Sequence, residues 1–133
     1  MSTAAKLIEL TVEECWEHLR EAEVGRVAVT VGTAPDIFPV NYLIHDDAIV
    51  IRTEAGTKLA AGTLMSSVAF EIDGIDDAEK RGWSVVVKGH GREATHLEEI
   101  LSLDDLGLRP WADTPKSRWM VIDPIEITGR RIV

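Results

Sequence analysis

The chain has 133 residues, a length that suits one folded domain spanning residues 1–133 with a buried core. Its 45% hydrophobic and 28% charged residues are typical of a globular protein, not of a disordered one. A net charge of −9 argues against nucleic-acid binding as the main role, because that role normally needs a basic face. No apolar run approaches a membrane span and no signal-peptide pattern begins the chain, so a cytoplasmic location is expected.

Residues 1–10 are expected to form a flexible arm, after which a first helix begins. Thr11 and Glu14 have the spacing of a capping box. Apolar residues then recur at helical spacing, which predicts one buried stripe containing Cys15 and Leu19. Cys15 has no activating base nearby in the sequence and is therefore interpreted as a core residue, not a nucleophile.

The apolar period changes to two after Gly25, which predicts an antiparallel meander of strands over residues 27–31, 37–45 and 48–53. Pro39 interrupts the second of these strands. Because proline cannot donate a hydrogen bond to a sheet ladder, Pro39 must lie at an edge, a bulge or another irregular point.

The remaining chain is expected to alternate short helices with strands. A helix over residues 56–65 precedes a strand over 67–73, a loop over 74–81 and a long strand over 83–93 with a bulge near Gly89 and Gly91. Thr95 and Glu98 form a second capping-box pattern, and two last strands over 118–122 and 125–133 are separated by a proline. These elements predict a mainly β fold, a small antiparallel barrel with two or three short covering helices.

One stretch combines the groups that bind an anion. Arg52, Thr53, Thr57 and Lys58 supply a guanidinium, two hydroxyls and an ammonium where a strand turns through a glycine into a helix. The unpaired amides of a helix start favour anions. The stretch lacks the Walker spacing, and the glycines of residues 89–91 lack the third glycine of a dinucleotide fingerprint. We interpret the junction as a phosphate site.

Four segments together resemble the flavin-binding split β-barrel family of pyridoxamine 5′-phosphate oxidase-like proteins. The likeness is closest to its short bacterial branch, which is related to nitroimidazole-resistance-type proteins. The segments are residues 24–28 (VGRVA), 39–42 (PVNY), 52–59 (RTEAGTKL) and 83–89 (WSVVVKG), with Trp119 and residues 127–131 (ITGRR) in the tail.

The resemblance implies a six-stranded split barrel that forms a homodimer, with FMN at the subunit interface. One strand would run beside the isoalloxazine ring, the anion-binding stretch would hold the phosphate, and residues of the other subunit and the tail would approach the flavin. The residues so implied are Pro39, Val40, Asn41, Tyr42, Arg52, Thr53, Thr57, Lys58, Trp83, Ser84, Trp119 and Arg130 or Arg131.

The function that the resemblance implies is an FMN-dependent oxidoreductase acting on an unknown small molecule, with no catalytic residue named. Oxidases of the vitamin B6 phosphate carry an Arg-x-His near the C-terminus, which this chain lacks, so that activity is not expected. A deazaflavin-dependent reductase, a non-catalytic flavin or haem module, and a barrel without a cofactor remain as alternatives. His45, His90 and His96 are the candidate iron ligands of the haem alternative, and no other metal site is expected.

Overall fold

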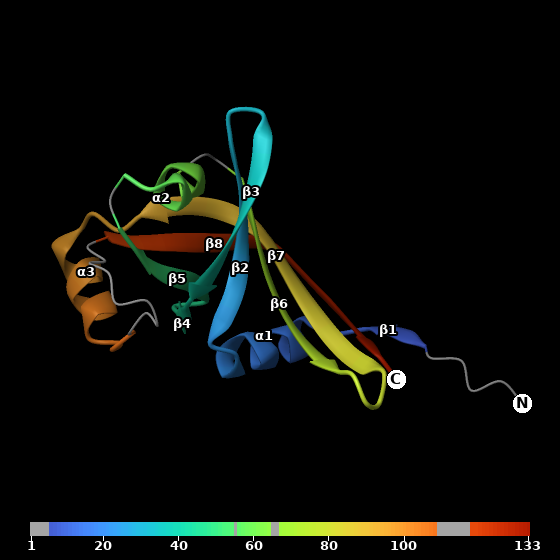
Figure 1. Ribbon diagram of the computed structural model, residues 1–133. Helices are drawn as coiled ribbons and strands as arrows, with labels where there is room; N and C mark the ends of the chain where they lie inside the picture. The colour runs from blue at the N-terminus through green and yellow to red at the C-terminus, as the bar shows by residue number, and fades with distance from the viewer. Residues whose placement is uncertain (1–5, 55, 65–66, 109–117) are drawn as a thin grey trace, which may run out of the picture.

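The computed structural model describes residues 6–54, 56–64, 67–108 and 118–133. Its elements are shown in Figure 1. In chain order they are β1 (Leu7–Glu9), α1 (Val12–Glu21), β2 (Val24–Val31), β3 (Ala34–Asn41), β4 (Leu43–His45), β5 (Ala48–Thr53), α2 (Lys58–Thr63), β6 (Val68–Asp76), β7 (Arg81–Glu93), α3 (Leu97–Asp104) and β8 (Arg118–Ile132).

In the described ranges, all eight strands belong to one antiparallel sheet, in the order β3-β2-β6-β7-β8-β5-β4, with β1 paired to β8. The sheet is strongly curled (Figure 1), and its edge strand β3 contacts β5 across the open seam of the curl. The predicted mainly β split barrel with short helices is therefore confirmed. The described residues form eight strands and not six, because part of the N-terminal arm is a strand and one predicted strand is divided.

The expectation of a flexible arm is wrong from Lys6 onward. Lys6 and Val133 exchange two backbone hydrogen bonds of 3.1 and 2.9 Å, and β1 pairs Leu7 with Ile132 and Glu9 with Arg130. This pairing satisfies backbone groups at the free edge of β8. Residues 1–5 of the expected arm lie outside the described residues.

The expected three-stranded meander is also wrong, because its middle strand divides at Tyr42. β3 pairs with β2 and β4 pairs with β5, so the two hairpins lie at opposite ends of the strand order. The N–H of Tyr42 donates to the carbonyl oxygen of Glu23 at 3.2 Å. The edge position predicted for Pro39 is confirmed, since β3 is a terminal strand of the sheet.

Three further boundaries differ from the prediction. The expected loop 74–81 is mostly hairpin, because β6 runs to Asp76 and β7 starts at Arg81. The two expected last strands are one continuous strand, β8, which includes Pro124. The β7–β8 register shifts between Lys88 and Gly89 of β7, opposite Pro124, and this shift confirms the predicted bulge. The second capping box is wrong: α3 has His96 at its N-cap without a side-chain cap and extends to Asp104.

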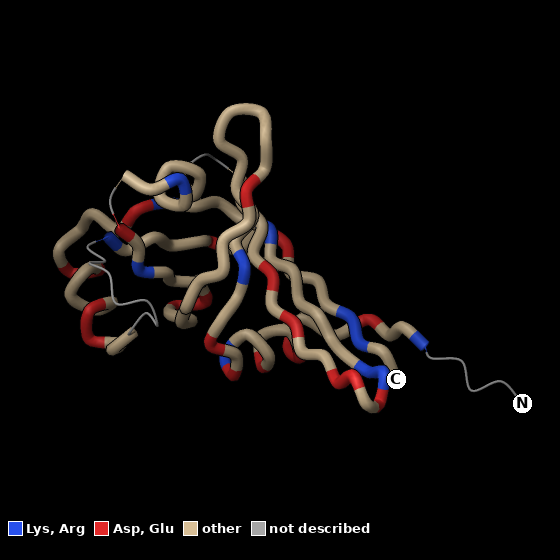
Figure 2. The backbone as a smooth tube through the Cα atoms, in the orientation of Figure 1, with Lys and Arg blue, Asp and Glu red and all other residues tan. Residues whose placement is uncertain are grey.

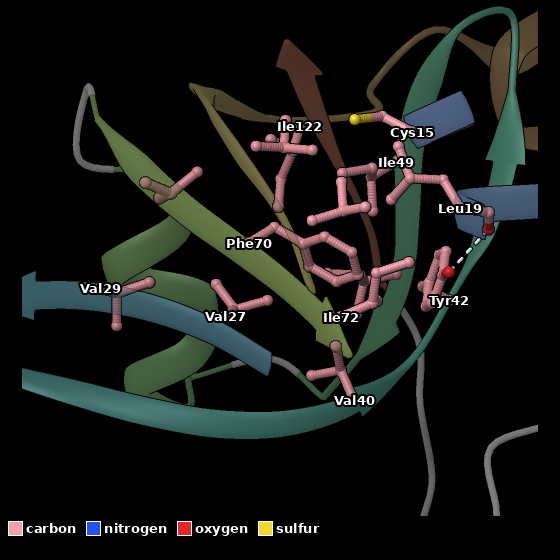
Figure 3. Close-up of a cluster of buried hydrophobic side chains, with 14 of the residues drawn as sticks. Cys15, Leu19, Val27, Val29, Val40, Tyr42, Ile49, Phe70, Ile72 and Ile122 are labelled. Carbon is pink, nitrogen blue, oxygen red and sulfur yellow. Dashed lines mark hydrogen bonds between the residues drawn. The ribbon is translucent and has the colours of Figure 1, made fainter. Parts of the chain in front are cut away.

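The core lies on the concave face of the sheet, where α1 packs Cys15 and Leu19 against strand residues (Figure 3). The hydroxyl of Tyr42 donates to the carbonyl oxygen of Leu19 at 2.6 Å, and its ring meets Phe70 edge to face. Burial raises the pKa of the Cys15 thiol, which agrees with its interpretation as a core residue. The first capping box is confirmed by reciprocal bonds of 3.0 and 3.1 Å between Thr11 and Glu14.

A second apolar cluster lies on the opposite, outer face of the sheet, under α3. Leu103 of α3 is packed there with Val50, Trp119 and Val121. Along the described part of the chain, Lys and Arg residues are interspersed with Asp and Glu residues (Figure 2). Within the described part of the chain, no helix is both long and apolar enough to cross a membrane.

Candidate functional site

Strand alternation divides the predicted phosphate-binding residues between the two faces of the sheet. Ile49 and Ile51 of β5 point into the core, and Thr53, which is 2% exposed, continues this inner row. Val50 and Arg52 point to the outer face, where α3 packs. Arg52 and Thr53 are neighbours in sequence, but their side chains leave the strand in opposite directions.

Arg52 lies against Trp119, its direct partner in the β5–β8 ladder. The guanidinium carbon is 5.3 Å from the centre of the Trp119 ring, a cation–π contact. The Trp119 N–H in turn donates to Asp104 Oδ1 at 2.7 Å. Arg52 Nε is buried and has no hydrogen-bond partner among the described residues. A buried donor without an acceptor is costly, so this atom fits an anionic ligand group.

The two threonine hydroxyls belong to the turn that begins α2. Thr57 Oγ1 donates to the Glu54 carbonyl oxygen and accepts from the Ala60 N–H, both at 3.1 Å, and it lies 3.4 Å from Thr53 Oγ1. Thr57 is thus the N-cap of a helix of six residues, and both hydroxyls are engaged in local contacts. Lys58 is exposed at the helix start, so Arg52 and Lys58 carry the positive charge of this end.

Arg118 is a further cation at this end that sequence reasoning missed. It is the direct partner of Thr53 in the β5–β8 ladder, and its Nη1 lies 3.2 Å from Glu93 Oε1. The sequence signal that could have identified Arg118 was its position directly before Trp119. The pairing with Thr53, however, depends on a strand register that local sequence does not specify.

The predicted ring-binding segment lies at the edge strand β3, across the seam from β5. Val40 and Tyr42 are buried in the core, with 7% and 1% exposure, and Pro39 and Asn41 alternate with them on the other face. The Tyr42 ring is therefore not accessible to a ligand, and the Tyr42 N–H is already donated to the Glu23 carbonyl oxygen. A hollow of about 190 Å³ borders Asn41 and Tyr42.

The residues expected to reach the flavin from the other subunit also divide between faces. Trp83 points inward, where its ring stacks on His18 with centroids 3.8 Å apart. Ser84 points outward beside its ladder partner Arg130, whereas Arg131 is the partner of Trp83. The structure thus brings Ser84 and Arg130 together, and separates both from Trp83 and Arg131.

Within one chain, the predicted site residues form two distant groups. One group lies at the seam and at the β5–β8 junction, and includes Arg52 and Trp119. The other lies where β7 starts and β8 ends, and includes Ser84 and Arg130. Trp119 and Arg130 are eleven residues apart along β8, a contour length of about 36 Å at about 3.3 Å per residue. One small ligand cannot contact both groups of the same chain.

The sequence profile of the pyridoxamine 5′-phosphate oxidase family matches residues 11–131. The chain belongs to this family. Its fold also matches the FAD binding protein from Mycobacterium smegmatis, which is 34% identical with a TM-score of 0.81 over 93% of this chain and 98% of that one. A conserved protein of unknown function from Corynebacterium diphtheriae is 36% identical, with a TM-score of 0.81 over 96% and 98% of the two chains.

Among curated sequences, an uncharacterized Mycobacterium tuberculosis protein, Rv0080, is 33% identical over 98% of this chain and 89% of its own length. One of the neighbours above is an FAD binding protein, and in this chain Arg52 Nε is buried without a hydrogen-bond partner among the described residues. The described residues contain no cluster of three or more histidine, cysteine or acidic side chains able to hold a metal ion.

Proposed function

We propose that this member of the family binds FMN, or the FMN half of FAD, and is an oxidoreductase for a small molecule. The observation that carries the proposal is the buried Arg52 Nε without a partner among the described residues, at the position where the family resemblance puts the cofactor phosphate. Arg52 and Lys58 would hold the phosphate, and the backbone of Pro39 to Tyr42 would border the ring. The flavin itself would supply the electron transfer.

In this proposal the working unit is a homodimer, and the location is the cytoplasm. The two groups of predicted site residues are separated by about 36 Å of β8 within one chain. A dimer would bring them together, because Ser84 and Arg130 of one copy would approach the flavin held at the seam of the other.

FAD is the second candidate cofactor, favoured by the FAD binding protein that is 34% identical to this chain. FMN and FAD share the ring, the ribityl chain and the first phosphate, so the residues above serve either one. A deazaflavin, which carries a longer acidic tail, is the third cofactor to be distinguished.

The test is to purify the protein, release any bound cofactor by denaturation, and identify it by mass spectrometry. A protein purified without a cofactor is then reconstituted separately with FMN and FAD. Binding of either flavin, followed by oxidation of NADH or NADPH by the loaded protein, is the expected result. A bound deazaflavin, or a protein that ignores both flavins, would overturn the flavin assignment, and tight binding without turnover would overturn the enzymatic part.

A further inference from the structure

A hollow of about 590 Å³ lies on the outer face of the sheet, where β1, β7 and β8 run together. This volume falls within the range of small-molecule sites. The hollow is distinct from the seam that holds the proposed flavin phosphate, because its lining residues on β8 are 127–130, toward the end of the strand opposite to Trp119.

One part of this hollow is polar and carries a cation. Arg130 lies directly opposite Ser84 in the β7–β8 ladder, and Thr128 is the next outward residue on β8. None of the ion pairs found among the described residues includes Arg130. A guanidinium with two hydroxyls beside it provides several donors for one oxyanion.

The rest of the hollow is apolar. Leu7 of β1, which is 61% exposed, borders it on the same face as Arg130 and pairs with Ile132. Val86 of β7 pairs with Thr128 and lies on the other side of Arg130. The exposed leucine would gain from contact with an apolar ligand body.

The charge balance of the hollow selects among anions. Glu9 is the ladder partner of Arg130 across β1 and β8, and it also lines the hollow. The single arginine is therefore offset by one carboxylate, and the second charge of a phosphate monoester would meet Glu9 without a further cation from the lining.

We propose that this hollow binds the substrate, and that the substrate is a small, mostly apolar molecule with one carboxylate. The carboxylate lies on Arg130, Ser84 and Thr128, and the apolar body extends along the face onto Leu7. This inference rests on the proposed function, since the substrate meets the flavin that the other copy of the dimer holds.

The experiment uses the flavin-loaded, full-length protein and titrates it with hexanoate, hexyl phosphate and hexanol by calorimetry. We expect hexanoate to bind at least about 10-fold more tightly than hexanol, because a charge-assisted bond contributes more than a tenfold change in affinity. Hexyl phosphate is expected to bind more weakly than hexanoate. Equal binding of hexanol, or tighter binding of hexyl phosphate, would overturn the assignment.

Two variants outside the proposed flavin site sharpen this test. Thr128→Val keeps the shape of the side chain and is expected to weaken hexanoate binding about 5–10-fold, the effect of one lost hydrogen bond, with flavin affinity unchanged. Glu9→Gln is expected to strengthen hexyl phosphate binding relative to hexanoate. Unchanged hexanoate binding in Thr128→Val contradicts the proposed cradle.

Failure of this inference and failure of the proposed function give different results. Flavin-loaded protein that turns over NADH or NADPH but does not bind hexanoate overturns the substrate class and leaves the function standing. Protein that binds no flavin, but binds hexanoate with the expected dependence on Thr128 and Glu9, supports the site and overturns the function.

Discussion

The guanidinium of Arg52 lies over the ring of Trp119, 5.3 Å from its centre, and Asp104 holds the N–H of that ring at 2.7 Å. Three elements therefore fix the position of one cation: β5 carries it, β8 supports it, and α3 holds the supporting ring. This arrangement limits the rotamers open to the arginine before any ligand binds, which lowers the entropic cost of binding.

Arg52→Ala is expected to weaken flavin binding about 10–100-fold, because a charge-assisted bond to a phosphate contributes about 1.5–3 kcal/mol. The measurement is a titration followed by the quenching of flavin fluorescence. Arg20→Ala is the matched control, since Arg20 lies on α1, makes the same kind of contact with the Trp16 ring at 5.4 Å, and approaches Asp47 at the surface at 3.6 Å. Equal flavin affinity in both variants would remove Arg52 from the site.

Gly91→Ala is expected to displace α2 and the cation at its start. A Cβ at residue 91 would clash with the Thr63 carbonyl oxygen, so α2 or β7 must move. The expected cost is about 1–3 kcal/mol of unfolding free energy, with weaker flavin binding because Lys58 moves with the helix. Urea denaturation and a flavin titration measure the two effects.

The control for that change is Lys88→Ala, an exposed position on the same strand. It is expected to alter neither quantity. If Gly91→Ala retained wild-type stability, the close packing of α2 against β7 would be contradicted.

Tyr42→Phe is expected to lower the unfolding free energy by about 1–2 kcal/mol and to leave flavin affinity unchanged. The substitution removes the buried hydroxyl that donates to the Leu19 carbonyl oxygen at 2.6 Å, and it leaves that acceptor at the end of α1 without this donor. The ring itself stays in the core against Phe70. Loss of flavin affinity with unchanged stability would place the phenol at the ligand instead.

Glu99→Gln is expected to reduce stability at neutral pH but not in acid. The Arg92 guanidinium, 2.7 Å from Glu99 Oε1, lowers the pKa of this carboxyl below its ordinary value. Because the folded pKa is below the unfolded one, the stabilisation is present above about pH 4.3 and is lost as pH falls through the folded pKa.

Solvent screening limits the stabilisation that the Arg92–Glu99 ion pair can provide. The side chains of Arg92 and Glu99 are 46% and 31% exposed, so about 0.5–1 kcal/mol is expected near pH 7. Thermal unfolding of the wild type and the variant between pH 3 and 7 provides the measurement, with Glu98→Gln on the same helix as the control. A stability difference that grew as the pH fell would contradict the assignment.

Local sequence predicted the features that depend on neighbours in the chain. The capping box of Thr11 and Glu14, the alternating strands and the edge position of Pro39 follow from spacing and from the missing proline N–H, and the structure confirms them. The resemblance in four short segments was also sufficient for the family.

Only the tertiary structure decided which of the predicted site residues meet. Strand register pairs Arg52 with Trp119, and it places Arg118 opposite Thr53. On the next ladder it pairs Ser84 with Arg130. It also turns Trp83 inward, where its ring stacks on His18. Register depends on contacts between residues far apart in the sequence, and a shift of one residue would turn each side chain to the other face. The sequence by itself therefore determined the kinds of chemical group available and the family. The pairing of strands determined which face each group occupies, and so divided one predicted site into two ends of a curled sheet.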